Sequence, residues 1–430
     1  MKIRGYTRCI RITRPFSGVQ GAAVRRQIRR CIVKDQKKTV LLGVTGGIAA
    51  YKAAAAASGL VKHGYDVHVL MTEHAREFIT PLTFETLTGN RCANDLFDRN
   101  FEFKTEHISL AKMADLVLIA PATANIIAKL AHGIADDMLT TTVLACRCPK
   151  LIAPAMNTAM YENPVTQHNL KLLSDFGYTV IEPVCGLLAC GDTGAGKLPE
   201  PGELIDHAEQ ILAHDKDMAG LRVLVTAGPT RETIDPVRFI SNHSSGKMGY
   251  AIARAASRRG AEVTLVSGPV SLTPPRFVKT VPVKNAAEMF GSVSSLSQDM
   301  DIIVKAAAVA DFRPSAPADE KIKKAGGTPV IELEKTQDIL KWLGEHRREG
   351  QFLCGFSMET ENVLENSRKK LGSKHVDMIV SNNLREKGAG FAGDTNHVTL
   401  ITKDSCTELP MLTKEETADR IFDEILKRRR

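Results

Sequence analysis

Strand-like and helix-like hydrophobic patterns alternate along most of the chain. Thr39–Val44 is an apolar run of strand length, and Ile48–His63 after it has the length and alanine content of a helix. Gly64 ends that helix, and Asp66–Met71 alternates as a second strand. Strand, helix and strand in this order predict a βαβ unit, and therefore a parallel sheet.

The alternation continues and predicts two sheets in succession. In the first half we expect further strands at Asp115–Ala120, Lys150–Ala153 and Tyr178–Glu182, a glycine-rich loop at Cys185–Pro201 and a helix at Gly202–His214. In the second half we expect strands at Arg222–Thr226, Glu262–Ser267, Asp301–Val304, Gln351–Gly355, Met378–Val380 and His397–Ile401, and helices at Lys247–Arg259 and Lys414–Lys427. The predicted fold class is α/β, with two Rossmann-like parallel-sheet domains.

A short polar segment, His214–Gly220, marks the boundary between the halves. The predicted organisation is a basic N-terminal extension (1–36), a first domain (37–214), a linker (215–220) and a second domain (221–430). The length of 430 residues suits two domains, because domains commonly have about 100–200 residues.

The charge of the chain is unevenly distributed. The formal net charge is +8, but Met1–Lys34 holds ten Lys and Arg and no Asp or Glu. The other 396 residues carry 47 basic and 49 acidic side chains, a net charge of −2. The body of the protein therefore lacks the general basic bias of a nucleic-acid-binding protein, and we expect no nucleic-acid partner.

Three interpretations of the basic extension remain open. It has the Arg-rich, acid-poor composition of a transit peptide, and its charge would also suit a nucleic-acid-binding arm. We favour a third, a wrongly set start ahead of a domain that begins near Val33–Thr39, or a disordered segment. No long apolar core of a secretion signal is present.

The lengths of the apolar runs and the cysteine content predict a cytoplasmic protein without a membrane partner. No apolar run reaches the roughly 18–20 residues that span a bilayer. The nine cysteines are odd in number and scattered, which disfavours a disulfide framework and indicates a reducing compartment.

Candidate binding residues in the first half follow the ends of predicted strands. Thr45–Gly47 joins a strand to a helix, so its backbone N–H groups either bind an anion or serve only a tight turn. The chain has neither the dinucleotide-binding glycine spacing here nor a Walker motif anywhere, which disfavours a nucleotide hydrolase. Thr72, Thr123 and Asn157 follow other strands, at the edge where α/β sheets bind ligands.

Three residues of the first half have open alternatives. Asn157 is either a helix or turn cap, or a group that binds a carboxylate or amide. His107 is more often structural in such a position than catalytic. Cys190 lies in the glycine-rich segment, where it is either an inert thiol or the acid of a mobile flap over the substrate.

Taken together, V-T-G-G-I-A-A-Y-K (44–52), P-A-M-N-x-x-M-Y (154–161) and A-C-G-D-x-G-x-G-K (189–197) resemble the flavin-dependent cysteine decarboxylases, and more narrowly the phosphopantothenoylcysteine decarboxylases. The resemblance implies a flavodoxin-like domain with FMN near Thr45, Gly46, Gly47, Thr72 and Thr123. It implies His107 as the catalytic histidine, Asn157 as the ligand of the substrate carboxylate and Cys190 as the proton donor. Gly196-Lys197-Leu198 departs from the family's usual Gly-Arg-Met, and a lysine can face phosphate only as a point charge.

The resemblance also implies the chemistry. Direct loss of CO₂ from a cysteine carboxylate would leave an unstabilised carbanion. FMN first oxidises the thiol to a thioaldehyde, which accepts the electrons as CO₂ leaves, and the resulting enethiolate is then reduced and protonated.

The second half has its own candidate anion-binding segments. Ser241–Gly249 places hydroxyls, glycines and a lysine at a helix start, which favours phosphate binding over a simple cap. Asp311 follows a small-residue run and could hold a divalent ion. Lys321–Lys324 is either a phosphate-facing or a solvated charge run. Lys370 and Lys374 near a helix end could simply complement its dipole.

These segments resemble phosphopantothenate–cysteine ligases. A-G-P-T-x-E-x-I-D-P-V-R (227–238), S-N-x-S-S-G-K-M-G (241–249), A-A-V-A-D-F (307–312) and K-I-K-K (321–324) occur in order. The resemblance implies that CTP activates the phosphopantothenate carboxylate as an acyl-cytidylate, which the cysteine amine attacks. Asn242 would hold the acyl-cytidylate, Arg238 would assist the cysteine step and Lys321 would stabilise phosphate charge. Implied CTP contacts are Ala307, Ala308, Asp311 (with Mg²⁺), Lys321, Thr336, Gln337, Asp338, Ile339, Phe356, Lys370 and Lys374.

The two resemblances predict one bifunctional enzyme of coenzyme A synthesis. Its small-molecule substrates would be 4′-phosphopantothenate, cysteine, CTP and phosphopantothenoylcysteine. The resemblance suggests trimers of the flavin domain, dimers of the ligase domain and a dodecamer. The alternatives are a regulatory FMN-binding protein without decarboxylase activity and a flavin prenyltransferase. The presence of His107, Asn157 and Cys190 argues against the regulatory protein. The segments 154–161 and 189–197 and the ligase half argue against the prenyltransferase.

Overall fold

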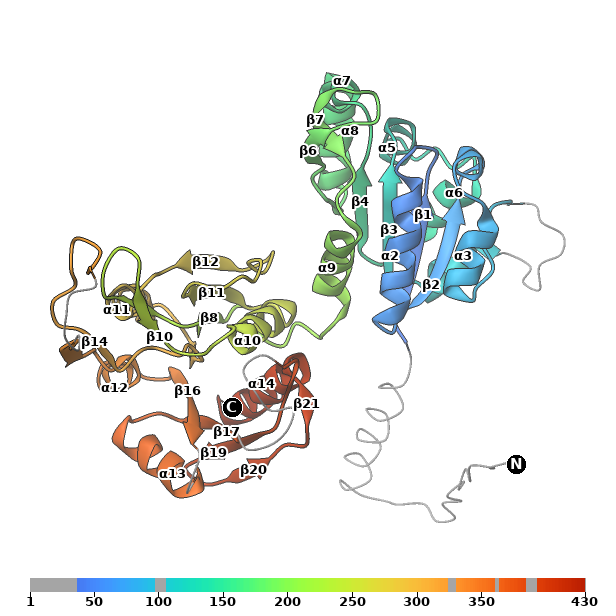
Figure 1. Ribbon diagram of the computed structural model, residues 1–430. Helices are drawn as coiled ribbons and strands as arrows, with labels where there is room; N and C mark the ends of the chain where they lie inside the picture. The colour runs from blue at the N-terminus through green and yellow to red at the C-terminus, as the bar shows by residue number, and fades with distance from the viewer. Residues whose placement is uncertain (1–36, 97–105, 324–329, 360–362, 384–392, 430) are drawn as a thin grey trace, which may run out of the picture. The chain divides into compact units, whose positions relative to one another are not determined.

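The computed structural model describes residues 37–96, 106–323, 330–359, 363–383 and 393–429. Its contacts divide the chain into two compact units, with the division between Ala208 and Glu209. The predicted basic extension, 1–36, lies outside the described residues. Figure 1 shows an α/β arrangement of helices and strands in each unit.

A five-stranded sheet forms the centre of the first unit, in the order β2-β1-β3-β4-β5. Its strands are β1 (Thr39–Val44), β2 (Asp66–Met71), β3 (Leu116–Ala122), β4 (Lys150–Pro154) and β5 (Tyr178–Val180). Every neighbouring pair is parallel, as the βαβ pattern predicts. The carboxyl ends of β1, β3 and β4 therefore meet at one edge of the sheet.

Helices cover the first sheet. They are α2 (Ala50–Lys62), the 3₁₀ turn η1 (Glu73–Glu77), α3 (Pro81–Thr88), α4 (Glu106–Met113), α5 (Ala124–Ala131), α6 (Met138–Ala145), α7 (Thr158–Glu162), α8 (Pro164–Asp175) and α9 (Pro201–Leu212). Residues of α4, α5, α6 and α8 share one apolar core with Leu41, Val117 and Ile119 of the sheet. Gly59 of α2 packs against Ile205 of α9, where a Cβ atom would lie 2.3 Å from Ile205 Cδ1.

The glycine-rich segment contains a β-hairpin, so the prediction of a loop at Cys185–Pro201 was wrong for the two strands. β6 (Val184–Leu187) pairs antiparallel with β7 (Thr193–Lys197), and Cys190 lies in the turn between them. Backbone bonds from Leu188 N to Asp192 O (2.8 Å) and from Gly191 N to Leu188 O (3.0 Å) close that turn. Glycine is depleted in strands, so its abundance concealed the hairpin.

The second unit contains an eight-stranded sheet in the order β12-β11-β8-β13-β16-β17-β19-β20. Its strands are β8 (Arg222–Ala227), β11 (Glu262–Ser267), β12 (Lys279–Pro282), β13 (Ile302–Lys305), β16 (Phe352–Glu359), β17 (Met378–Asn383), β19 (Val398–Thr402) and β20 (Cys406–Glu408). The first six in spatial order are parallel, whereas β19 and β20 join antiparallel. A short connection such as 403–405 permits only antiparallel pairing, so the sheet is mixed at this edge.

Both faces of the second sheet are covered. The helices are α10 (Lys247–Arg258), α11 (Ala286–Ser297), α12 (Ile339–Glu345), α13 (Val363–Ser373) and α14 (Lys414–Arg429). Val223 and Val225 of β8 share a core with α10 and α14, whereas Leu224 between them shares another with α11 and α12. This alternation explains why β8 is apolar at successive positions.

Three small two-stranded sheets complete the second unit. They are β9 (Arg231–Thr233) with β10 (Phe239–Ser241), β14 (Phe312–Pro314) with β15 (Leu333–Lys335), and β18 (Thr395–Asn396) with β21 (Leu412–Thr413).

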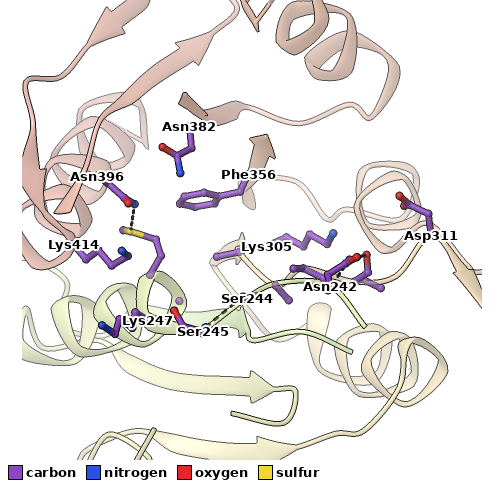
Figure 2. Close-up of a pocket in the computed structure, with 17 residues that line it drawn as sticks. Asn242, Ser244, Ser245, Lys247, Lys305, Asp311, Phe356, Asn382, Asn396 and Lys414 are labelled. Atoms are coloured by element: carbon purple, nitrogen blue, oxygen red, sulfur yellow. Dashed lines mark hydrogen bonds between the residues drawn. The ribbon is translucent and has the colours of Figure 1, made fainter. Parts of the chain in front are cut away.

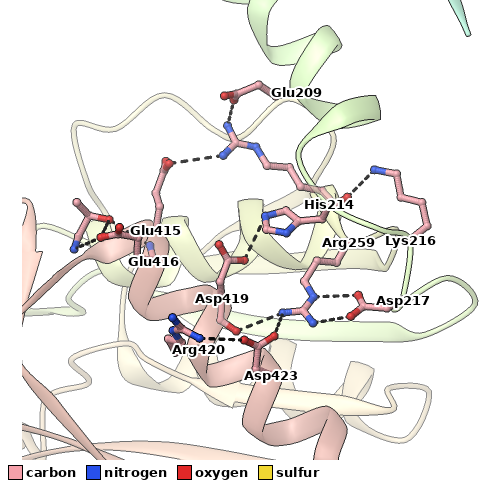
Figure 3. Close-up of polar contacts among 12 residues, drawn as sticks. Glu209, His214, Lys216, Asp217, Arg259, Glu415, Glu416, Asp419, Arg420 and Asp423 are labelled. Atoms are coloured by element: carbon pink, nitrogen blue, oxygen red, sulfur yellow. Dashed lines mark hydrogen bonds and ion pairs between the residues drawn. The ribbon is translucent and has the colours of Figure 1, made fainter. Parts of the chain in front are cut away.

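The division between the units lies earlier than the boundary predicted at 214, because the segment after Ala208 is bonded to the second unit (Figure 3). Glu209 pairs with Arg258 of α10. Asp217 Oδ2 lies 2.6 Å from Arg259 Nη2, and His214 Nε2 lies 3.3 Å from Asp419 Oδ1 of α14. The residues proposed as a linker, 215–220, therefore lie within the second unit.

No helix in the described ranges combines the length and the apolar character that crossing a membrane requires.

Candidate active sites

At the carboxyl edge of the first sheet, the turn after β1 is bonded to the loop after β3. Thr45 is 2% exposed, and its hydroxyl donates to Pro121 O at 2.8 Å. The same hydroxyl accepts from Thr123 N at 3.2 Å. Thr123 is also the N-cap of α5, where its side chain accepts from Ile126 N. These bonds hold two of the predicted FMN-binding threonines against each other.

A cavity of about 590 Å³ opens at this edge. It is lined by Gly46, Gly47 and Thr123 of the predicted FMN set, and by Asn157 and Cys190 of the predicted catalytic set. Other lining residues lie within 48–52, 121–124, 155–160, 187–189 and 196–198. The structure therefore brings together five predicted residues from four separate segments of the sequence.

Asn157 combines both roles that its position allowed. It is the N-cap of α7, with Oδ1 accepting from Ala159 N at 2.9 Å. Its Nδ2 donates to Asp192 Oδ2 at 2.7 Å and to Cys190 Sγ at 3.3 Å. The Cys190 thiol in turn donates to Asp192 Oδ2 at 3.3 Å. The cap fixes the amide, and the amide and Asp192 position the exposed thiol at the cavity.

Gly196 anchors the hairpin beside Asn157. Met156 N donates to Gly196 O at 3.0 Å. Gly196 has a φ of +137°, and a Cβ atom there would lie 2.2 Å from Met156 O. Only glycine fits this close approach of two backbones, so the turn that carries Cys190 is held to the loop that carries Asn157.

Sequence reasoning missed Lys52 and Asp192. Lys52 lines the cavity and is 8% exposed, with Nζ donating to Glu200 Oε1 at 2.8 Å and to Leu198 O at 3.1 Å. A lysine in an otherwise Ala-rich helix was the available signal for Lys52. Lys197, which replaces the arginine of the family pattern, also lines the cavity and is exposed.

His107 and Thr72 are not among the residues that line this cavity. His107 is half-buried in the first turn of α4, beside residues 97–105 that the structure does not describe. Thr72 follows β2, and its N–H donates to Val44 O at 3.1 Å. The roles of both residues remain predictions.

The first cavity suits FMN in its size and in its lining. Cofactor sites commonly have volumes of about 300–1,000 Å³ and mainly apolar walls with a few polar groups. Ile48, Met160 and Leu187 supply apolar surface here. The turn at Gly46 is close-packed, since a Cβ atom there would lie 2.5 Å from His74 Cβ. Its glycines leave the backbone N–H groups before α2 open to a phosphate.

A second cavity, of about 330 Å³, lies at the carboxyl ends of the strands in the second unit (Figure 2). Its lining includes Asn242, Ala307, Ala308, Asp311 and Phe356, all predicted from the sequence. The other lining residues are Ser244–Gly249, Lys305, Ala306, Val309, Asn382, Asn396 and Lys414.

Asn242 is bonded to the small-residue loop after β13. Its Nδ2 donates to Val309 O at 3.1 Å and to Ala308 O at 3.3 Å. Thr226 of β8 also holds this loop, because its hydroxyl accepts from Ala307 N at 3.1 Å. The two segments that the family resemblance assigned to the acyl-cytidylate and to CTP are therefore adjacent.

Lys305 is the main lining residue that sequence reasoning missed. It ends β13, immediately before the small-residue loop, and Figure 2 shows its amine directed toward Asn242. Burial lowers the pKa of Lys305, and the nearby carboxylates Asp338 and Asp311 act in the opposite direction. A lysine at the carboxyl end of a buried strand was a signal present in the sequence.

The other predicted CTP residues do not line the cavity, but they neighbour Lys305. Lys374 pairs with Asp338, which caps α12. Burial alone would raise the pKa of Asp338, and the Lys374 contact holds it below its usual value. Lys370 Nζ donates to Ser357 Oγ at 3.2 Å. Charges on Asp338, Lys370 and Lys374 all act on Lys305. Thr336, Gln337 and Ile339 adjoin Asp338 in sequence and also lie outside the lining.

Arg238 and Lys321 are not among the residues that line the second cavity. Arg238 donates through Nε and Nη2 to Asp235 Oδ2, at 2.9 and 2.5 Å, and through Nη2 to Ile322 O at 2.8 Å. Asp235 also accepts from Ile322 N at 3.1 Å. The Asp235–Arg238 pair thus holds the backbone next to Lys321, whose side chain is exposed. The catalytic roles of Arg238 and Lys321 remain predictions.

Among the described residues, no group of three or more His, Cys, Asp or Glu is placed to hold a metal ion. Mg²⁺ that arrives with a nucleotide needs only one or two carboxylates, because the phosphates and water supply the other ligands. Asp311 is exposed and lines the cavity, so it could supply one such carboxylate.

Comparisons with known proteins match both halves of the chain. Residues 29–213 match the family model described as "Flavoprotein", and 218–428 match "DNA/pantothenate metabolism flavoprotein C-terminal domain". The "Coenzyme A biosynthesis bifunctional protein CoaBC" of Bacillus subtilis is 49% identical over 392 residues, which cover 90% of this chain and 96% of that protein. This chain belongs to that family. The Escherichia coli K12 protein of the same name is 44% identical over 91% of this chain and 97% of its own length.

A solved structure, the "C-terminal Domain of Coenzyme A biosynthesis bifunctional protein CoaBC", is 49% identical with a TM-score of 0.42, and covers 49% of this chain and 97% of that chain. The family confirms the recognition and the α/β class that the sequence predicted. The individual site residues are not tested by these matches.

Proposed function

We propose that the second unit joins cysteine to 4′-phosphopantothenate with CTP, and that the first unit converts the product into 4′-phosphopantetheine. The chain is a bifunctional enzyme of coenzyme A biosynthesis with a decarboxylase and a ligase half. The observation that carries this assignment is the presence of two separate cavities, each lined by residues of one half.

In the ligase cavity, the carboxylate of 4′-phosphopantothenate attacks the α-phosphate of CTP, which releases pyrophosphate and forms an acyl-cytidylate. The cysteine amine then attacks the acyl carbon, and CMP leaves. Asn242 holds the acyl-cytidylate beside the backbone of 306–309. Asp311 would hold the Mg²⁺ that accompanies CTP, and Lys305 would add positive charge for the phosphates. Lys321 stabilises the phosphate in the transition state, and Arg238 assists the attack by cysteine.

In the decarboxylase cavity, this chain supplies positioning and protons. FMN, when bound, supplies the two-electron acceptor that oxidises the substrate thiol so that CO₂ can leave. The Asn157 amide holds the substrate carboxylate next to the thiol of Cys190. Cys190 Sγ delivers its proton to the substrate carbon in the last step, and Asp192 orients that thiol beforehand. His107 serves as the catalytic histidine.

A regulatory FMN-binding protein is the alternative, and the site disfavours it. Asn157, Asp192 and Cys190 form one hydrogen-bonded set at the cavity, which FMN binding alone does not require.

Mass spectrometry of a reaction with purified protein, 4′-phosphopantothenate, cysteine, CTP and Mg²⁺ tests the proposal. We expect 4′-phosphopantetheine together with CMP. Accumulation of phosphopantothenoylcysteine would leave the ligase assignment standing and contradict the decarboxylase assignment if FMN is bound. Absence of both products from folded protein would refute the whole proposal.

We propose further that the enzyme is a homo-oligomer, with trimeric flavin units, dimeric ligase units and a dodecamer as the complete assembly. The position of His107 outside the lining of the cavity with Cys190 supports association of copies, because a second chain could complete the set. The molar mass from light scattering tests this, and a monomer that turns over both substrates would contradict it.

We propose a cytoplasmic location. All seven cysteines in the described ranges are free, as a reducing compartment favours. Fractionation of cells that express the native gene would contradict this if the protein were found outside the cytoplasm.

A further inference from the structure

Two cysteines lie together in the first unit, in the connection between α6 and β4. Cys146 is the C-cap of α6, and Cys148 follows it two residues before β4 begins at Lys150. Both thiols are free, and they share a hydrogen bond. They precede the amino end of β4, whereas the first cavity lies at the carboxyl edge of the sheet, and neither cysteine lines that cavity. The pair is therefore separate from the site that carries Cys190.

The two thiols have different surroundings. Cys146 is 6% exposed and belongs to the apolar core of the first unit, and Cys148 is half-buried beside that core. Lys150 Nζ donates to Cys148 O at 3.3 Å and lies 5.5 Å from the centre of the Tyr178 ring. Its amine is thus held at the turn that contains the pair. One thiol is partly open to solvent beside a cation, and its neighbour is shielded from water.

These surroundings decide which thiol loses its proton. The hydrogen bond with Cys148 and burial raise the pKa of Cys146. The hydrogen bond from Cys146 lowers the pKa of Cys148, and the charge of Lys150 acts in the same direction, against the effect of burial. The thiolate therefore forms at Cys148, with the protonated thiol of Cys146 next to it. A thiolate is the nucleophilic form of cysteine.

The C-x-C spacing suits a bond between the two sulfur atoms. Cα atoms two residues apart in a chain are separated by at most about 7 Å, and disulfides commonly join Cα atoms at about 4.4–6.8 Å. Cys146 has extended backbone, with φ −72° and ψ 135°. Among the described residues, no third His, Cys, Asp or Glu completes a metal site with the pair. The pair therefore suits dithiol chemistry rather than metal binding.

We propose that Cys146 and Cys148 form a peroxide-reactive modification site, in which Cys148 is oxidised first and Cys146 then closes a reversible disulfide with it. The site is independent of the proposed decarboxylase and ligase reactions, because neither cysteine lines either cavity. Disulfides in reducing compartments are usually transient and redox-sensing, which agrees with two thiols that are free in this structure.

The reaction balances with hydrogen peroxide as the oxidant. The Cys148 thiolate attacks one peroxide oxygen and the O–O bond breaks, which converts Cys148 into a sulfenic acid and releases hydroxide. The sulfur of Cys146 then attacks the sulfur of Cys148, its proton goes to the departing hydroxyl group, and water leaves. The two sulfur atoms lose two electrons in total, and the peroxide gains them. Two equivalents of an external thiol reverse the modification by exchange, because a disulfide closed over so short a loop is strained and easily reduced.

Peptide mass spectrometry of the full chain, after brief exposure to a few equivalents of hydrogen peroxide, tests the proposal. The remaining free thiols are alkylated in denaturant, and the protein is digested with trypsin. Trypsin cleaves after Arg147, so Cys146 and Cys148 fall on different peptides unless a disulfide joins them. We expect the joined peptides, with a mass two hydrogens below the sum of the two, and we expect dithiothreitol to separate them.

Two variants separate the roles of the pair. In Cys146→Ala the sulfenic acid at Cys148 has no thiol beside it, so we expect it to accumulate and to be trapped by dimedone. In Cys148→Ala we expect Cys146 to stay reduced, because its thiol is buried and protonated. This second variant changes a half-buried side chain and remains usable should Cys146→Ala, in the core, fail to fold. Cys406→Ala is the control, since Cys406 is exposed in β20 of the second unit, and it should leave the joined peptides unchanged.

Cys406 also gives the reference rate in the wild type. We expect Cys148 to react with peroxide at least about fivefold faster than Cys406, because an ordinary thiol is only a few per cent thiolate at neutral pH. Equal rates would overturn the inference, and so would a disulfide that joins Cys148 to a cysteine other than Cys146. Sulfenic acid that persists at Cys148 in the wild type would also overturn it, because Cys146 would then fail to close the bond.

Discussion

Cys190→Ser is expected to lower the formation of 4′-phosphopantetheine by about 100-fold or more while CO₂ is still released. A positioned acid contributes about 10²–10⁴ to the rate of a proton transfer, and a hydroxyl is a far weaker acid than a thiol. Cys190 acts only in the last protonation of the proposed sequence, so the earlier loss of CO₂ does not need it. Mass spectrometry of the products and trapping of labelled CO₂ measure the two steps separately.

The matched control is Cys185→Ser on the same hairpin. Cys185 is exposed in β6 and is not among the residues that line the cavity. We expect near-normal turnover from it. Unimpaired formation of 4′-phosphopantetheine by Cys190→Ser would refute the acid role. Loss of CO₂ release as well would show that Cys190 acts earlier than proposed. Ligation should remain unchanged in both variants.

The central strands were predictable because their pattern reflects burial. β2 and β11 begin and end at the predicted residues, Asp66–Met71 and Glu262–Ser267. β8 is apolar at successive positions because separate cores lie on its two faces. Ends of helices were less accurate, since the helix predicted from Ile48 begins at Ala50. The local hydrophobic pattern is enough to locate these buried strands, and long-range contacts change their bounds little.

Features that depend on long-range contacts were not predictable from one sequence. The β6–β7 hairpin is stabilised by its contact with Met156 rather than by strand propensity. Asn396 and Lys414 line the second cavity together with residues at the start of α10, and no local pattern in the sequence indicates that these segments meet. Short motifs located parts of both sites because each motif follows a strand, and parallel strands bring their carboxyl ends together.

Within the described residues of one chain, the two cavities differ in how many of their predicted catalytic residues they bring together. The first joins Asn157, Asp192 and Cys190 into a bonded set at the cavity. Asn242 lines the second cavity and Lys321 and Arg238 do not, although the family resemblance assigns all three to one reaction. Ligation therefore depends on the contact of Asp235 with Arg238 and Ile322, which holds the backbone next to Lys321.

Asp235→Asn is expected to lower ligation by about tenfold or more, through a lower kcat, while decarboxylation of supplied phosphopantothenoylcysteine continues. Asp235 is 1% exposed and accepts from the N–H groups of Val237 and Ile322 as well as from Arg238. Asparagine removes the charge and turns one acceptor into a donor that faces other donors. The backbone next to Lys321 then loses its anchor, so Asp235 is a positioning residue.

Thermal unfolding against pH separates this role from a general loss of packing. The Arg238 contact holds the pKa of Asp235 well below its usual value. A carboxylate whose pKa is lowered on folding stabilises the protein above its unfolded pKa of about 3.9, and this contribution is lost as the pH falls below that value. The Tm difference between wild type and Asp235→Asn should therefore be constant from neutral pH to about pH 5 and narrow below about pH 4.

Asp319→Asn is the matched control, because Asp319 is an exposed carboxylate two residues before Lys321. It should leave ligation and Tm near the wild-type values. Normal ligation by Asp235→Asn would show that the Lys321 segment reaches the nucleotide without this anchor. A Tm difference that stays constant as the pH falls below 4 would show that the lost stability came from packing rather than from the charge of Asp235, because only the charge disappears on protonation.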